Sequence, residues 1–90
     1  MVCLVLLMLL PVTAMAQNTV SGTVFEDDGT SPLTGATVQV KGTSTAVSTD
    51  IDGKYRLSGV KKNATLVFTF IGFTPQEVKV DGRSEINVTM

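Results

Sequence analysis

Apolar and polar residues alternate with a period of two in four stretches of the chain, at residues 20–24, 36–41, 54–58 and 85–90. In a strand, such alternation places one set of side chains in a core and the other in water. No stretch after residue 16 keeps apolar residues at positions i, i+3, i+4 and i+7 for more than one turn. The pattern therefore predicts strands and no helix in residues 17–90.

Three further stretches predict strands of a different kind. Residues 66–71 are apolar on both faces, so this strand is expected to be the most buried. Val78 and Val80 indicate another strand after Pro75. Residues 45–49 are mostly polar and predict a weak strand at the edge of a sheet, where it could pair with another chain.

Turn-forming residues separate these stretches, at Asp27-Asp28-Gly29, Pro32, Gly35, Lys62-Asn63, Ile71-Gly72 and Asp81-Gly82. Asp52-Gly53 also predicts a tight hairpin, in which both central residues have positive φ. Six or seven short strands separated by turns about every 8–12 residues are typical of a β-sandwich or barrel. The apolar residues suffice for one core layer between two sheets.

The first sixteen residues are predicted to be a signal peptide. Residues 2–12 are almost entirely apolar, and Ala14-Met15-Ala16 is an A-x-A cleavage pattern, so the mature domain is expected to span residues 17–90. No Lys or Arg precedes the apolar run, which indicates that translation starts upstream of Met1. An N-terminal anchor helix is the alternative. The single cysteine, Cys3, falls in this leader, so the domain itself has no thiol for a disulfide, a metal site or a nucleophile.

Composition removes most kinds of chemistry. The chain has 90 residues, a net charge of −1 and no histidine. The absence of histidine excludes a Ser-His-Asp triad and histidine metal ligands, and the balanced charge gives no basic surface for nucleic acid. We therefore expect no enzyme, and no catalytic, cofactor-binding or metal-binding residue; the residues of a binding site are left open.

The acidic residues are the remaining candidates for a catalytic or metal site. Glu26, Asp27 and Asp28 form one group and Asp50 and Asp52 another, and both groups lie in turn sequences, where aspartate bonds to the backbone. Residues 50–53 match the beginning of a calcium loop but lack the later ligands, so a turn is favoured. Replacing Asp50 and Asp52 is expected to lower stability and not to abolish a reaction.

Two sequons and three aromatic residues complete the candidates. The sequons, at residues 63–65 and 87–89, matter only in a host that glycosylates such sites. Phe68 and Phe70 share one face of an apolar strand and are expected in the core. Phe73 follows Gly72 at a strand end and is the one aromatic residue expected to be partly exposed for surface contact.

Four ordered motifs resemble one known family. They are Val20-Ser21-Gly22-Thr23-Val24, the run from Pro32 to Thr43, the run from Thr49 to Leu57, and Leu66-Val67-Phe68-x-Phe70-Ile71-Gly72-Phe73. Together they resemble the carboxypeptidase-D-regulatory-like domain at the N-terminus of SusC/RagA-type TonB-linked outer-membrane proteins of Bacteroidetes, over nearly all of residues 19–90. The resemblance implies an all-β, seven-stranded antiparallel sandwich of the prealbumin or transthyretin-like, immunoglobulin-like kind.

The resemblance also implies a function. Such a domain is a non-catalytic accessory module at the periplasmic face of the outer membrane, in an importer of glycans or peptides. Its partners are the plug and barrel of the same protein, the TonB complex and a SusD-like lipoprotein, and it needs no cofactor. Since no plug or barrel follows Met90, a fragment of a longer transporter is expected. A stand-alone exported module that binds carbohydrate or protein is the alternative.

Three positions depart from the family pattern. Ser31 resembles an insertion in the turn before Pro32, and residues 59–62 replace a usually shorter turn. Ala46 stands where the family commonly has glycine, so a positive φ there would be strained. These departures put the local loop geometry in question more than the fold.

Overall fold

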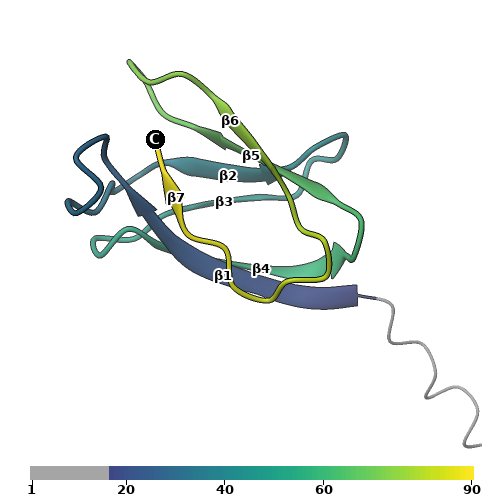
Figure 1. Cartoon of the computed structure of the whole chain (residues 1–90). Helices are drawn as coiled ribbons and strands as arrows, with labels where there is room; N and C mark the ends of the chain where they lie inside the picture. The colour runs from purple at the N-terminus through teal and green to yellow at the C-terminus, as the bar shows by residue number, and fades with distance from the viewer. Residues whose placement is uncertain (1–16) are drawn as a thin grey trace, which may run out of the picture.

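The computed structural model describes residues 17–90 as seven strands joined by turns (Figure 1). The strands are β1 (Gln17–Phe25), β2 (Thr37–Val40), β3 (Ala46–Ser48), β4 (Lys54–Lys61), β5 (Thr65–Thr69), β6 (Gln76–Lys79) and β7 (Val88–Thr89). The predicted signal peptide, residues 1–16, lies outside the described residues. Within residues 17–90, no helix is long and apolar enough to span a bilayer.

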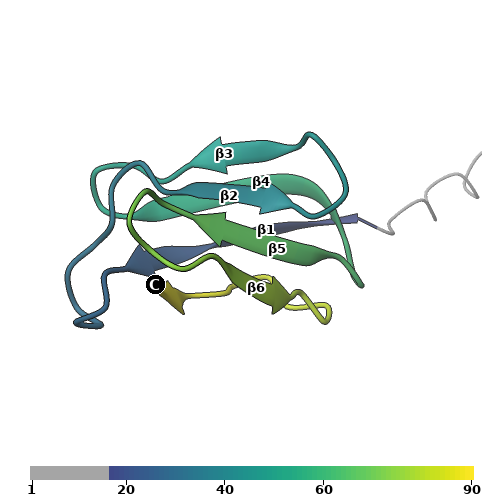
Figure 2. The ribbon, with the colours of Figure 1, turned by 90° about the horizontal axis from the view of Figure 1, so that it is seen from above.

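The strands form two sheets that pack face to face (Figure 2). One sheet has the order β4-β1-β7 and the other the order β3-β2-β5-β6. All pairs are antiparallel except β1 and β7, which run parallel with Val24 opposite Val88. The all-β sandwich of seven strands is confirmed, and β3 is the predicted edge strand. The parallel pair was not foreseen from the sequence.

The C-terminal segment lies along β1 and forms one edge of the first sheet. The backbone N–H of Ser21 donates to the carbonyl of Ser84 at 3.0 Å, and that of Ile86 donates to Ser21 at 2.9 Å. Further along, Met90 N–H donates to the carbonyl of Phe25 at 2.9 Å. The C-terminal segment therefore runs parallel to β1 over this whole stretch. It reaches β1 by crossing from the second sheet to the first.

Apolar side chains from both sheets fill the layer between them, as the alternating pattern predicted. Tyr55 from β4 meets Phe68 from β5 edge to face, with ring centroids 5.5 Å apart. Leu66 and Phe68 are fully buried. The other buried apolar residues are Val20, Val24, Leu33, Ala36, Val38, Leu57, Val60, Val80, Ile86, Val88 and Met90.

Gly22 lies where β1, β4 and the C-terminal segment meet. The Tyr55 hydroxyl donates to the carbonyl oxygen of Ile86 at 2.6 Å, directly beside this glycine. A Cβ on Gly22 would lie 1.9 Å from that same oxygen. Burial raises the pKa of Tyr55 to about 12, so the phenol keeps the proton that it donates. Glycine is required here for close backbone approach and not for its φ.

The predicted hairpin at Asp52-Gly53 is wrong. Its flanking strands, β3 and β4, belong to different sheets, so the turn at residues 50–53 carries the chain from one sheet to the other. Gly53 has φ 74°, but Asp52 does not have positive φ; among the described residues other than glycine, only Asp81 does. The sequence correctly predicted a turn at these residues. Its geometry is not that of a hairpin, because the strands on either side belong to different sheets.

Three other local expectations are corrected by the strand bounds. β5 ends at Thr69, and Ile71 is 94% exposed in the following turn, so the strand does not extend to residue 71. β4 continues through Gly59 to Lys61, so the turn there begins at Lys62. Ala46 lies in β3 without positive φ, and the strain considered for it does not arise.

Candidate interaction surface

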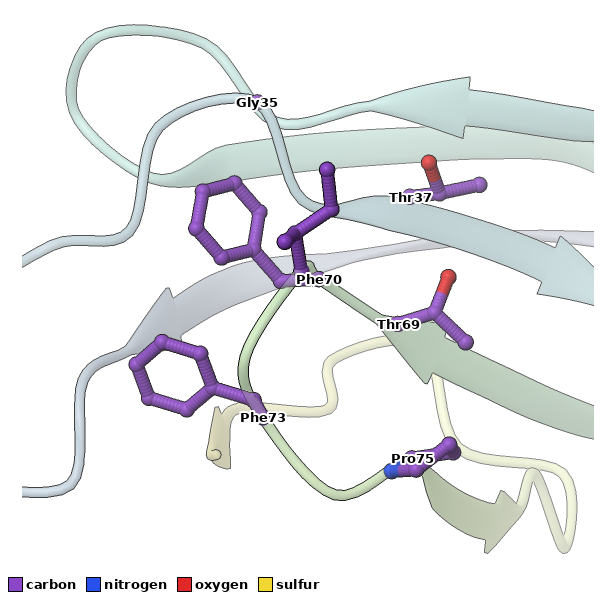
Figure 3. A pocket seen from close by; sticks show the side chains of 7 residues that line it. Gly35, Thr37, Thr69, Phe70, Phe73 and Pro75 are labelled. Carbon is purple, nitrogen blue, oxygen red and sulfur yellow. The ribbon is translucent and has the colours of Figure 1, made fainter.

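A shallow hollow of about 380 Å³ lies at one end of the sandwich, where β5 turns toward β6 (Figure 3). Its floor and walls come from the turn after β5 and from the beginning of β2. The lining residues are Gly35, Thr37, Thr69, Phe70, Ile71, Phe73 and Pro75. The lining is mainly apolar, with two threonine hydroxyls at its margin, and it carries no charged group.

The turn at residues 70–73 builds the apolar part of this hollow. Phe73 N–H donates to the carbonyl of Phe70 at 3.1 Å, and Gly72 has φ 88°. The rings of Phe70 and Phe73 then meet edge to face with centroids 5.8 Å apart. Their contact with the core fixes the turn, and Ile71 at its tip is directed into solvent, 94% exposed.

The opposite wall is formed by the segment before β2. Buried Thr49 fixes this segment, because its hydroxyl donates to Leu33 O at 2.5 Å and accepts from Ala36 N–H at 2.9 Å. Gly35 is thereby placed beside the Phe70 ring: a Cβ on Gly35 would lie 3.9 Å from a carbon of that ring. The wall is therefore backbone, which leaves the hollow open.

A second exposed isoleucine adjoins the same wall. Ile51 is 79% exposed, and its carbonyl accepts a hydrogen bond from Thr34 Oγ1 at 3.2 Å. Thr34 precedes Gly35, so the turn at residues 50–53 lies next to the hollow. Ile51 and Ile71 are the two exposed large apolar residues of the part of the chain that is described. We call the set of Gly35, Ile51, Phe70, Ile71, Phe73 and Pro75 the apolar loop surface.

The sequence predicts only part of this surface. Phe68 is in the core, as predicted, and Phe73 is partly exposed, also as predicted. Phe70 was expected in the core and is half-buried at its margin. Ile51 and Ile71 were missed, although the sequence held a signal: each is an apolar residue inside a turn sequence, between two aspartates or before a glycine.

The acidic residues near this end are engaged in turns. Asp28 Oδ1 accepts from the backbone N–H groups of Thr30 and Ser31, at 2.9 and 2.8 Å, and its Oδ2 accepts from the Ser31 hydroxyl at 2.6 Å. The bond from the Ser31 hydroxyl and the two backbone bonds lower the pKa of Asp28 to about 2. Ser31, which resembles an insertion, is thus an integral part of the loop.

Asp50 has the corresponding role in the turn at residues 50–53. Its Oδ1 accepts from the backbone N–H groups of Asp52 and Lys54, both at 2.9 Å. No three acidic side chains gather as a metal site anywhere in residues 17–90. The arrangement is that of an aspartate that closes a turn through its own backbone neighbours.

Asp50→Ala is expected to lower the free energy of unfolding by about 1–2 kcal/mol, because two backbone donors lose a charged acceptor. Asp52→Ala is the matched control: no backbone donor bonds to the Asp52 side chain, so the loss of stability that the sequence predicted for this position is corrected to a change within about 0.5 kcal/mol. Urea unfolding of residues 17–90 measures both. Equal losses in the two variants, or a rise in the wild-type midpoint on adding millimolar calcium, would contradict the assignment of Asp50 to a turn.

The two predicted sequons differ in their surroundings. Asn63 is exposed in the turn between β4 and β5. Asn87 is exposed too, but its Oδ1 accepts from the backbone N–H of Thr23 at 2.9 Å and so attaches the C-terminal segment to β1. Asn87 therefore has a structural role that the sequon did not indicate.

Comparison with known proteins identifies relatives along almost the whole described chain. The profile of the CarboxypepD_reg-like domain family matches residues 20–90. The chain is 43% identical over 78 residues to the TonB-dependent receptor SusC of Bacteroides thetaiotaomicron, which covers 86% of this chain and 8% of the receptor. It is 39% identical over 75 residues to the TonB-dependent receptor P39 of Formosa agariphila, which covers 83% of this chain and 7% of that receptor.

These similarities concern a small part of each relative. The chain spans less than a tenth of the length of the receptors it matches, and the similar parts are their N-terminal regions. Among solved structures, a chain of a type II cohesin–X–dockerin complex from Acetivibrio cellulolyticus is similar, with a TM-score of 0.63 and 26% identity. That match covers 80% of this chain and 52% of the other, so the same fold is there joined to further polypeptide.

Proposed function

This chain belongs to the CarboxypepD_reg-like domain family, in the form found in SusC-type TonB-dependent receptors, and we propose that it is the non-catalytic N-terminal accessory domain of such a receptor. The sandwich is the transthyretin-like fold of that family. The observation that carries the proposal is the 43% identity to the N-terminal region of a SusC receptor over 86% of this chain.

The architecture supports a binding or positioning role. The core occupies the layer between the sheets, the carboxylates of Asp28 and Asp50 close turns, and the most exposed apolar side chains lie in two turns at one end. On this proposal, the domain contributes contacts and carries out no chemistry. The cohesin–X–dockerin relative, in which a similar fold forms about half of a chain in a protein complex, is consistent with such a role.

The proposal places the domain in a larger assembly. Following a signal peptide at residues 1–16, residues 17–90 would lie at the periplasmic face of the outer membrane. The partners would be the plug and barrel of the same receptor, the TonB complex and a SusD-like lipoprotein. The imported nutrient would be selected by the barrel, so no specificity is assigned to this domain.

Sequencing the transcript beyond the codon for Met90 tests this function. We expect the same reading frame to continue into a TonB box and a plug within a few hundred codons. A stop codon directly after Met90, with no frameshift, would refute the receptor role and leave a stand-alone exported module. A glycan array and a pull-down with residues 17–90 would then separate a carbohydrate-binding module from a protein-binding one.

A further inference from the structure

The exposed apolar residues and the exit of the chain lie at the same end of the molecule. Figures 1 and 2 both show the C-terminus beside the loops that join β1 to β2, β3 to β4 and β5 to β6, opposite the end where β1 begins. Met90 is held there by its bond to Phe25 at the end of β1. Any polypeptide that follows Met90 therefore leaves the sandwich next to the apolar loop surface.

The apolar loop surface is costly to leave in water. Ile71 and Ile51 are 94% and 79% exposed, and they are the exposed large apolar residues of the described part of the chain. Burial of such a side chain against a partner removes its apolar surface from water and is therefore favourable. Next to them lies a hollow of about 380 Å³ with half-buried phenylalanine walls, which offers a receiving site for a side chain of a partner. Exposed apolar side chains beside such a hollow are typical of a docking surface.

The charged residues near this surface indicate that its partner carries positive charge. Five of the eight acidic residues of the protein lie in the loops at this end: Glu26, Asp27, Asp28, Asp50 and Asp52. Most of the basic residues lie elsewhere, including Lys41, Lys61 and Lys62 around the turns at the opposite end. An apolar surface at the acidic end of the molecule is complementary to a surface with apolar side chains surrounded by lysine or arginine.

We infer that the apolar loop surface docks onto the first folded unit that follows Met90 in the receptor, through a patch of that unit that is apolar at its centre and basic at its rim. This rests on the proposed function, because it needs the polypeptide that follows. Two properties select this occupant over a second copy of the domain. The continuing chain is tethered beside the surface at high effective concentration. A second copy would bring the same acidic loops, and the like charges would repel.

Single cysteines in the complete receptor test the contact, since residues 17–90 contain none. Ile71→Cys and Ile51→Cys would be made in a receptor whose other cysteines are replaced by serine. Ser44→Cys, at an exposed position in the turn between β2 and β3 at the opposite end, is the matched control. The rate of maleimide labelling would be measured for each in the folded receptor and normalised to the rate in urea.

We expect both isoleucine positions to label at least tenfold more slowly than Ser44→Cys, and raised salt to reduce this protection. Labelling of Ile71→Cys and Ile51→Cys as fast as the control would overturn the inference. Protection that disappears on dilution of the receptor would also overturn it, because the occupant would be a second copy. These outcomes leave the receptor role intact, whereas a stop codon after Met90 removes the role before any labelling is done.

Discussion

Gly22→Ala is expected to lower the free energy of unfolding by about 3–5 kcal/mol. The new Cβ would lie 1.9 Å from the carbonyl oxygen of Ile86 and 3.1 Å from the Tyr55 hydroxyl, so the C-terminal segment has to move away. That movement breaks the bond between Ile86 and Ser21 and the bond between Tyr55 and Ile86. Because small domains are stable by only about 5–15 kcal/mol, this is a large part of the total.

The measurement is urea unfolding of residues 17–90, followed by far-UV circular dichroism and by the fluorescence of Tyr55. Tyr55 is the single tyrosine, and the protein has no tryptophan, so its signal reports on this contact directly. Gly42→Ala is the matched control: Gly42 has φ 82°, and a Cβ there has no neighbour within 4 Å. It should cost only the left-handed conformation, about 1–2 kcal/mol. A loss at Gly22 no greater than that at Gly42 would refute the close approach.

Phe68→Ala is expected to cost about 3–5 kcal/mol, the usual price of an aromatic ring removed from a closed core. Phe68 is fully buried in the centre of β5, and its ring meets Tyr55 across the two sheets. Removing the ring leaves a cavity between the sheets and deprives Tyr55 of its aromatic neighbour. Thermal and urea unfolding of residues 17–90 measure the effect.

Ile71→Ala is the control that separates the core from the surface. It lies three positions later in the same apolar run, but it is 94% exposed, so its truncation should stay within about 0.5 kcal/mol. If Ile71→Ala were as destabilising as Phe68→Ala, Ile71 would be part of the core, and the apolar loop surface would lose its most exposed member. A normal fold for Ile71→Ala also makes the labelling experiment interpretable.

Local alternation was sufficient to predict most of the sandwich. Val20 and Val24 in β1, and Tyr55 and Leu57 in β4, are buried at every second or fourth position because one face of each sheet meets the core. The run containing Ala46 and Val47 was predicted as an edge strand because it is mostly polar, and β3 pairs with β2 alone at the edge of its sheet. The family resemblance then supplied the number of strands.

The features that escaped prediction depend on contacts between distant segments. The parallel pairing of β1 and β7 joins residues about as far apart in sequence as the domain allows, and no local pattern encodes direction. The turn at residues 50–53 has the residues of a hairpin, yet it connects two sheets, because β3 pairs with β2 and β4 pairs with β1. Ile71 continued an apolar run, and only the turn at residues 70–73 directs it into solvent.

The parallel pairing at the two ends of the chain also sets an order of events during biogenesis. Ile86, Val88 and Met90 pack in the same core as Val20 and Val24. The first strand is therefore fully paired only after the last few residues are in place. While those residues are still within the ribosome or a translocation channel, β1 presents an open edge and an unfilled core to its surroundings. Chains with such late, long-range closure fold slowly and are exposed to aggregation in the interval. For this domain, that interval lasts until Met90 has emerged.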